Sequence, residues 1–213
     1  MEEGFLDSSV IWAYVGPRER EPRHETCVAI FDSGHAARLT SETVRTEVRQ
    51  SERRRERLYA DLIAHLRAGR RVDEFPVDAY SRHVAARAME LVRRVRMNLA
   101  DIEYFRRLGQ MEGARLREAW SKVQSPLIRA AHDAYLEDSL RVRLGVELGD
   151  AKVLSDYLLW APGRREAKFV TADDRFLTVI RASLAGFLAD QAVSKPVVDD
   201  FLEPEGFLAR LDE

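Results

Sequence analysis

Short apolar runs alternate with segments of helical spacing along most of the chain. Phe5 and Leu6 lead into Asp7, and an apolar run resumes at Val10. Similar runs occur at 37–40, 168–171 and 196–198, and each is brief enough to be a buried strand. Strands that alternate with helices predict an α/β fold of three layers, in which a central parallel sheet is covered by helices on both faces.

The middle of the chain has only helical patterns. Residues 49–57 are polar on every side, and apolar spacing returns from residue 59 to residue 66. A second stripe recurs at steps of three or four residues and predicts one long helix. Its members are Val84, Ala88, Leu91, Val95, Leu99, Ile102 and Phe105. We expect this stripe to pack against helices at 58–66 and 127–144, the latter begun by Ser125 and Pro126, or against a second subunit.

The composition indicates an ordinary globular chain. Its 213 residues are enough for one sizeable core, so a single domain is the simplest expectation. No apolar run approaches the roughly 18 residues of a membrane span. Glu2 and Glu3 occupy the region that is basic in a signal peptide. We therefore expect a cytoplasmic protein without a membrane partner. The lone Cys27 is expected in the core, and the five histidines, which follow no ligand spacing, at the surface or at helix caps.

Four acidic residues occupy positions where open α/β sheets keep their chemistry. Asp7 and Asp173 follow apolar runs, whereas Glu47 and Asp150 lie near the starts of helices. Strand ends of a parallel sheet meet in one crevice, so these acids can converge. Clustered carboxylates need a cation to stay ionised, and oxygen ligands suit Mg²⁺ or Mn²⁺. Such ions promote phosphodiester hydrolysis by activating water and stabilising the leaving oxygen.

Together these motifs resemble the PIN-domain nucleases. The matching segments are Leu6 to Val10, Ser41 to Glu47, Asp150 with Ala151, Thr171 to Phe176, and the tail from Phe201 to Leu208. The resemblance covers residues 4–50 and 145–211 and implies a PIN-like fold. It also implies that Asp7, Glu47, Asp150 and Asp173 are catalytic metal ligands for Mg²⁺ or Mn²⁺. Because 103 residues separate Glu47 from Asp150, more than in a compact member, we expect a helical insertion at roughly 50–145.

The acids also have simpler structural interpretations. Asp7 and Asp150 could be helix caps, and Glu47 could pair with a neighbouring arginine at the surface. Asp173 competes with Asp174, and the Thr-x-Asp spacing favours Asp173, which leaves Asp174 in a supporting role.

Three other polar residues are candidates for supporting roles. Ser8 and Thr171 adjoin the first and last acidic motifs and are expected either to orient a carboxylate or to bond to the backbone. Asp156, six residues after Asp150, is a weaker candidate because six is not a same-face helical spacing.

Charge is unevenly distributed along the chain. Residues 43–143 hold 22 Lys and Arg against 15 Asp and Glu, whereas the remainder holds 12 against 21. Arginine, which binds phosphate through two parallel hydrogen bonds, outnumbers lysine by 30 to 4. The arginines expected to contact RNA are Arg49, Arg53, Arg54, Arg55 and Arg57. The alternative is an ordinary solvated helix face.

The function implied by the resemblance is a metal-dependent endoribonuclease that hydrolyses RNA. The commonest role in the family is a toxin whose partner is an antitoxin protein. A tRNA-processing enzyme similar to the small protein-only RNase P type is an alternative, because that type also carries a helical insertion. A non-catalytic module that binds RNA or protein is a third hypothesis, and loss of one of the four acids would favour it.

Overall fold

The computed structural model describes residues 2–17, 21–164, 166–191 and 200–211. The chain divides into two compact units, each with its own hydrophobic core. The first unit comprises Met1–Val48 and Leu116–Glu213, and the second comprises Arg49–Arg115. The second unit is shorter than the insertion expected at roughly 50–145, because residues 116–145 pack in the first. The strand expected at 196–198 lies outside the described residues.

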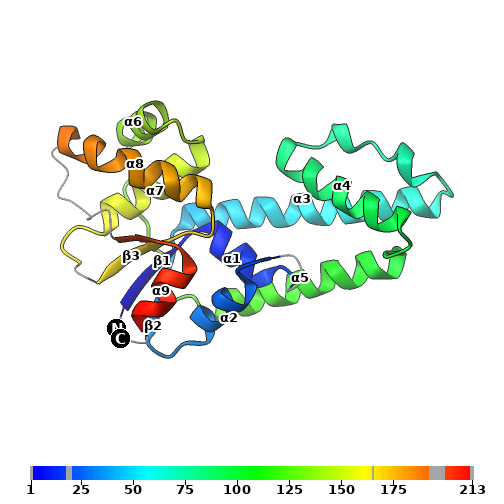
Figure 1. Ribbon diagram of the computed structural model, residues 1–213, viewed down its shortest axis with the longest axis horizontal. Coiled ribbons are helices and arrows are strands. Elements are labelled where there is room, and N and C mark those ends of the chain that lie inside the picture. Colours follow the sequence, from blue (N-terminus) through cyan, green and yellow to red (C-terminus); the bar gives the residue numbers. More distant parts are fainter. Residues whose placement is uncertain (1, 18–20, 165, 192–199, 212–213) are drawn as a thin grey trace. The chain divides into compact units, whose positions relative to one another are not determined.

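The first unit is built on a parallel sheet with the strand order β2-β1-β3-β4 (Figure 1). The strands are β1 (Glu2–Leu6), β2 (Ala36–Leu39), β3 (Ala167–Val170) and β4 (Phe201–Leu202). The central strands end in apolar residues that are fully buried, as expected where helices cover both faces of a sheet. The predicted α/β class with a parallel sheet is therefore confirmed.

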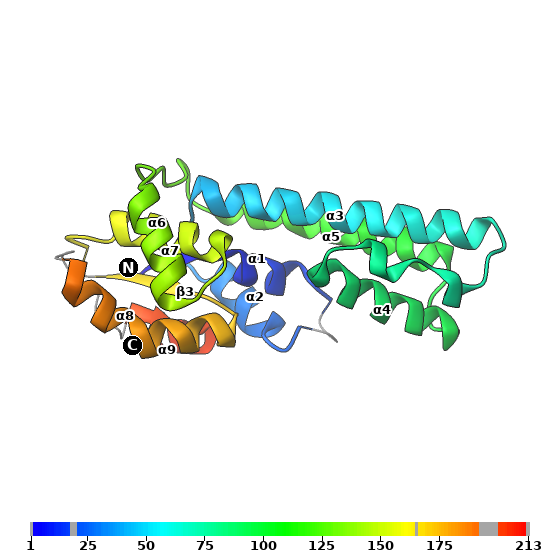
Figure 2. The same cartoon turned by 90° about the horizontal axis from the view of Figure 1, so that it is seen from above.

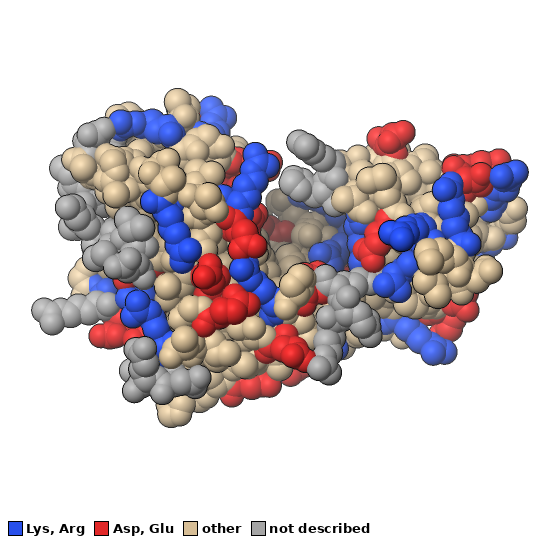
Figure 3. Space-filling view, in the orientation of Figure 1, with Lys and Arg blue, Asp and Glu red and all other residues tan. Residues whose placement is uncertain are grey.

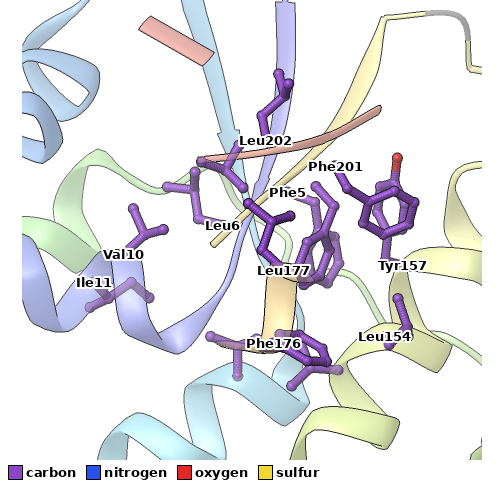
Figure 4. Packing of buried hydrophobic residues seen from close by; sticks show 14 of the residues in the cluster. Phe5, Leu6, Val10, Ile11, Leu154, Tyr157, Phe176, Leu177, Phe201 and Leu202 are labelled. Carbon is purple, nitrogen blue, oxygen red and sulfur yellow. The ribbon is translucent and has the colours of Figure 1, made fainter. Parts of the chain in front are cut away.

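One face of the sheet carries a row of aromatic rings. Phe5 is in register with Phe169, which is in register with Phe201. The ring of Tyr157, in α7 (Leu148–Trp160), packs edge-on against all three, at centroid distances of 5.6, 5.3 and 5.3 Å (Figure 4). Each buried aromatic side chain removes a large apolar area from water, so this row contributes much of the core's stability.

The opposite face is covered by α9 (Pro204–Leu211). A β-carbon at Gly4 would lie 2.7 Å from the ring of Phe207, so only glycine allows α9 to approach β1 this closely. Since neighbouring residues of a strand point to opposite faces, Gly4 and Phe5 place α9 and α7 on different sides of the sheet. Helices therefore lie on both faces.

Four further helices complete these layers (Figures 1 and 2). They are α1 (Ser8–Val15), α2 (His24–Asp32), α6 (Ala134–Leu144) and α8 (Asp174–Gln191). α2 packs against α1 and α9, whereas α6 packs against α7 and α8. Among the described residues, no helix is both long and apolar enough to cross a membrane.

The segment expected to start a helix at Ser125 and Pro126 is not helical but bends at these two residues. The backbone N–H of Gln124 donates to Arg38 O at 2.8 Å, and that of Ile128 donates to Thr40 O at 2.9 Å. These bonds align the segment with the end of β2, which satisfies backbone groups that a sheet edge would otherwise expose. The helix in this region begins only at Ala134.

The second unit is helical. It contains most of α3 (Glu42–Arg67), the short turns η1 (Val72–Glu74) and η2 (Val77–Ala79), α4 (Arg82–Arg96) and most of α5 (Ile102–Lys122). Its buried core consists of Leu58, Tyr59, Leu62, Phe75, Val84, Ala88, Leu91, Val92, Phe105 and Leu108. The α3 segment at 58–66 thus packs against the predicted stripe, as expected.

Three expectations about this stripe and the histidines are wrong. The stripe is not one helix, because α4 ends at Arg96 and Asn98 adopts a left-handed φ of 55° before α5 begins, which leaves Leu99 exposed. Residues 134–144 contribute to the other core.

His24 and His65 are buried rather than superficial, since each ring hydrogen-bonds to a backbone carbonyl, whereas Cys27 is buried as expected.

Candidate functional site

The candidate site begins where β1 ends. Asp7 follows the last residue of β1, its backbone N–H donates to Val170 O at 3.0 Å, and it caps the amino terminus of α1. Its side chain is only 7% exposed. The parallel pairing of β1 with β3 thus brings Asp7 beside the segment that follows Val170.

Three donors fix the Asp7 carboxylate. Oδ1 accepts from the backbone N–H of Ser8 at 2.6 Å, and Oδ2 accepts from Ser9 Oγ at 2.7 Å and from Thr171 Oγ1 at 2.9 Å. The hydrogen bond expected of Thr171 is therefore present. The serine hydroxyl that orients the carboxylate belongs to Ser9, whereas Ser8 contributes its backbone. Ser9 also accepts from the backbone N–H of Ala172 at 2.9 Å, which ties the two strand ends together.

Asp173 and Asp174 have different partners. Asp173 caps α8, because its Oδ1 accepts from the backbone N–H of Phe176 at 2.9 Å. Asp174 accepts from Arg23 Nη2 at 2.7 Å. The same guanidinium pairs with Glu205 at 3.1 Å. Arg23 therefore links Asp174 to Glu205 of α9, whereas Asp173 contributes to the raised pKa of Asp150.

Asp150 lies in the first turn of α7 and is affected by the other acids. Burial, followed by the negative charges of Asp7, Asp173 and Glu147, raises the pKa of Asp150 to about 7. A hydrogen bond with the backbone of Glu147, the residue before the helix, acts in the opposite direction. Asp7 and Asp173 therefore both contribute to the electrostatic environment of Asp150, although burial has the larger effect on its pKa.

Glu47 reaches the same turn of α7 from α3. A β-carbon on Gly149 would lie 2.5 Å from Glu47 Oε1, so the carboxylate lies against the backbone of the residue that precedes Asp150. The neighbouring Val48 is fully buried, as the sequence predicted. By contrast, Glu42 is directed toward Arg129, at 3.7 Å. The structure thus brings Glu47, and not Glu42, to the acidic residues.

A second carboxylate of α7 holds the start of α3 in place. The side chain of Asp156 accepts hydrogen bonds from Ser41 and Thr43, which lower its pKa against the stronger opposing effect of burial. Ser41 Oγ in turn accepts from the backbone N–H of Val44 at 3.2 Å. Asp156 therefore links α7 to the first turn of the helix that carries Glu47, a positioning role rather than contact with a ligand.

The candidate ligands are all oxygen donors, which hard divalent cations prefer. All four candidate ligands are carboxylates, and the negative charges that raise the pKa of Asp150 are of the kind that a cation offsets. Within the described parts of the chain, no three Asp, Glu, His or Cys side chains are close enough together to hold an ion as they stand. Cation binding would therefore require the carboxylates to move closer together.

Comparisons with other proteins do not assign a function. No protein-family model, curated protein or solved structure matches the chain. What the acidic residues do is therefore inferred from their geometry and from the resemblance of the sequence motifs.

The predicted RNA-binding arginines are not equivalent. Arg49, Arg53, Arg54 and Arg57 are exposed, whereas Arg55 is half-buried and pairs with the buried Glu112 at 3.2 Å. Arg55 therefore has a structural role inside the helical unit.

The two units differ in charge. The second unit holds 16 Lys and Arg against 10 Asp and Glu, and the first holds 18 against 26. In Figure 3, acidic side chains gather on the visible face of the first unit, with basic ones among them.

Three residues of the site were not found from the sequence. Ser9 has a recognisable signal, because it lies two residues after Asp7 in the same motif. Gly149 and Arg23 have none, because their importance depends on contacts with Glu47 and Asp174, which are more than a hundred residues away in the sequence.

Proposed function

We propose that the chain is a divalent-cation-dependent endoribonuclease of the PIN type. The observation that supports this most directly is the hydrogen bond from Thr171 Oγ1 to Asp7 Oδ2, which joins the first acidic motif to the segment that carries Asp173, and both acids contribute to the raised pKa of Asp150. Their order along the chain is that of the PIN motifs. A carboxylate set without a nucleophilic Ser, Cys or His suits hydrolysis by an activated water.

The roles of the individual residues follow from their contacts. Asp7, Glu47, Asp150 and Asp173 would hold Mg²⁺ or Mn²⁺, which supplies the Lewis acid for phosphodiester hydrolysis. Ser9 and Thr171 keep Oδ2 of Asp7 in one orientation. A carboxylate oxygen has two acceptor sites, so Oδ1 can accept from Ser8 and still bind a cation.

The exposed arginines of α3 would bind the RNA backbone. Arg49, Arg53, Arg54 and Arg57 offer guanidinium groups that pair with phosphate oxygens. The net positive charge of the helical unit favours association with a polyanion at low salt. Each phosphate contact made by these residues should release condensed counterions and make binding salt-dependent.

The direct test is cleavage of labelled RNA by the purified chain. We expect cleavage with Mn²⁺ or Mg²⁺, no cleavage with EDTA, and recovery when the cation is added back in excess. An oligonucleotide of the same sequence made of DNA is the control for substrate class. Binding of RNA without cation-dependent cleavage would instead support the non-catalytic module, and cleavage that persists in EDTA would contradict the proposal.

A further inference from the structure

The helical unit contains a cavity of about 760 Å³ along one face of α3. A volume of this order is typical of small-molecule sites. The α3 residues that line it recur at helical spacing and are Arg54, Arg57, Asp61, Ala64 and His65, and Ala68 lines it just after the helix ends. The small Ala64 and Ala68 leave room between the longer side chains. The opposite wall comes from the segment between α3 and α4 and includes Arg70, Phe75 and Tyr80.

This opposite wall presents stacked aromatic rings. The rings of Phe75 and Tyr80 are nearly parallel, at 5.8 Å and 16°, and His65 meets Phe75 edge-on at 5.4 Å. Phe75 is buried, whereas Tyr80 is half-buried and therefore partly accessible from the cavity. The Tyr80 hydroxyl donates to Asp61 Oδ2 at 2.8 Å, which fixes the ring. Burial and the Asp61 charge raise the pKa of Tyr80 to about 12, so the phenol stays protonated at neutral pH.

Arginines from both walls make the lining of the cavity positively charged. Arg54, Arg57 and Arg70 are exposed around it, and Asp61 is the carboxylate in the described lining. Asp61 lies 3.7 Å from Arg57 and also accepts from Tyr80, so its charge is partly compensated. Three guanidinium groups against one carboxylate favour an anionic ligand.

We propose that this cavity binds a nucleotide. Its phosphate would bind Arg54, Arg57 and Arg70, and its base would lie against the ring of Tyr80. Guanidinium groups match phosphate geometry, and aromatic rings stack on bases without strong sequence preference. A bare phosphate would make no use of the aromatic wall. The site depends only on the chemistry of the cavity and does not require the acidic residues to cut RNA.

The nucleotide can be free or part of an RNA strand, and binding experiments distinguish these sources. Titrations of the full chain in EDTA, which suppresses cation-dependent cleavage, would use AMP, a short single-stranded RNA and inorganic phosphate. AMP binding identifies a free nucleotide, whereas RNA binding without AMP binding identifies a nucleotide within a strand. Either result supports the site if the variants below respond.

Two sets of variants test the arginines and the aromatic ring separately. The double variant Arg54→Gln/Arg70→Gln should weaken binding roughly tenfold or more, since each loses a charge-assisted hydrogen bond. Tyr80→Leu should weaken it roughly tenfold through lost stacking. Arg67→Gln, an exposed arginine of α3 outside the lining, and Tyr80→Phe, which keeps the ring, are the matched controls. Circular dichroism would establish that Tyr80→Leu is folded, and the arginine variant does not alter the core.

Three results would overturn the proposal. The first is that neither AMP nor RNA binds. The second is that the Arg54/Arg70 variant binds as tightly as the unaltered protein. The third is that inorganic phosphate competes as well as AMP, which would mean that the ring of Tyr80 contributes nothing.

Discussion

Oγ1 of Thr171 donates a 2.9 Å hydrogen bond to Oδ2 of Asp7, although 164 residues separate them. Thr171 is fully buried, and its oxygen also accepts from the backbone N–H of Asp173 at 3.1 Å. The register that pairs Leu6 with Val170 places the two strand ends side by side, so the bond follows from the parallel sheet. Thr171 thereby orients both Asp7 and the loop that carries Asp173.

Replacing this hydroxyl should affect both stability and the site. Thr171→Val keeps the shape but removes one of the two donors to Asp7 Oδ2 and leaves the backbone N–H of Asp173 without this acceptor, which should cost about 1–3 kcal/mol of unfolding free energy and lower cleavage. Thr178→Val is the matched control, because that hydroxyl is exposed and donates to a backbone carbonyl of its own helix. Urea denaturation measures both variants, and equal losses would mean that the Thr171 bond has no special role.

Asp150 should make the stability of the protein depend on pH. Its folded pKa of about 7 exceeds the ordinary value of 3.8, so the folded state binds the proton more tightly and loses stability as pH rises between these values. Asp150→Asn cannot ionise, and its melting temperature in EDTA should exceed that of the unaltered protein by a margin that grows from about pH 4 to about pH 7. A margin that is constant with pH would mean that Asp150 does not sense the other acids.

The sequence predicted β1, β2 and β3 because each ends in apolar residues that a polar residue follows, but it did not predict β4 at Phe201–Leu202. It also predicted that Asp7 and the segment of Thr171 lie at the same edge of the sheet, since parallel strand ends gather there. The Thr171 bond could be anticipated for the same reason. These features depend on local patterns and on a topology that the alternation of elements already implies.

Other features depend on contacts that no local pattern contains. The stripe from Val84 to Phe105 keeps its helical spacing through a turn at Asn98, so periodicity alone could not reveal two helices. Arg55 resembles its exposed neighbours in sequence, but it pairs with Glu112, which lies 57 positions later. Packing between distant segments decides both outcomes.

The contact between Glu47 and Gly149 can be tested by adding one carbon. Gly149→Ala should push the Glu47 carboxylate away and lower cleavage, while helix stability gains up to about 1 kcal/mol. Gly186→Ala in α8 is the control, because a β-carbon there has no atom within 4 Å, and it should gain stability without loss of activity. Full activity of Gly149→Ala would mean that the position of Glu47 is unimportant.

The helical unit should depend on a buried ionic network. Glu112 is 5% exposed and accepts from Tyr59 at 2.9 Å, from Arg55 at 3.2 Å and from Arg87 at 3.3 Å. Glu112→Ala removes the buried carboxylate that Tyr59, Arg55 and Arg87 share, and the loss of these charge-assisted hydrogen bonds should cost about 1–3 kcal/mol. The control Glu103→Ala removes exposed ion pairs on the same helix and should cost less than about 1 kcal/mol. Similar melting temperatures for the two variants would argue against the network.

The most direct test of the proposed nuclease site is the rate of RNA cleavage by Asp7→Asn in saturating Mn²⁺. Asparagine keeps the size of the side chain and caps a helix as well as aspartate does, so the variant should fold normally by circular dichroism. Removing a residue that only hydrogen-bonds to a metal ligand typically lowers activity roughly 10–100-fold. Asp7→Asn should lower the cleavage rate by more than this, because it removes the charge of a ligand itself. We predict no cleavage above background, and a folded Asp7→Asn variant that cuts RNA as fast as the unaltered protein would contradict the assignment.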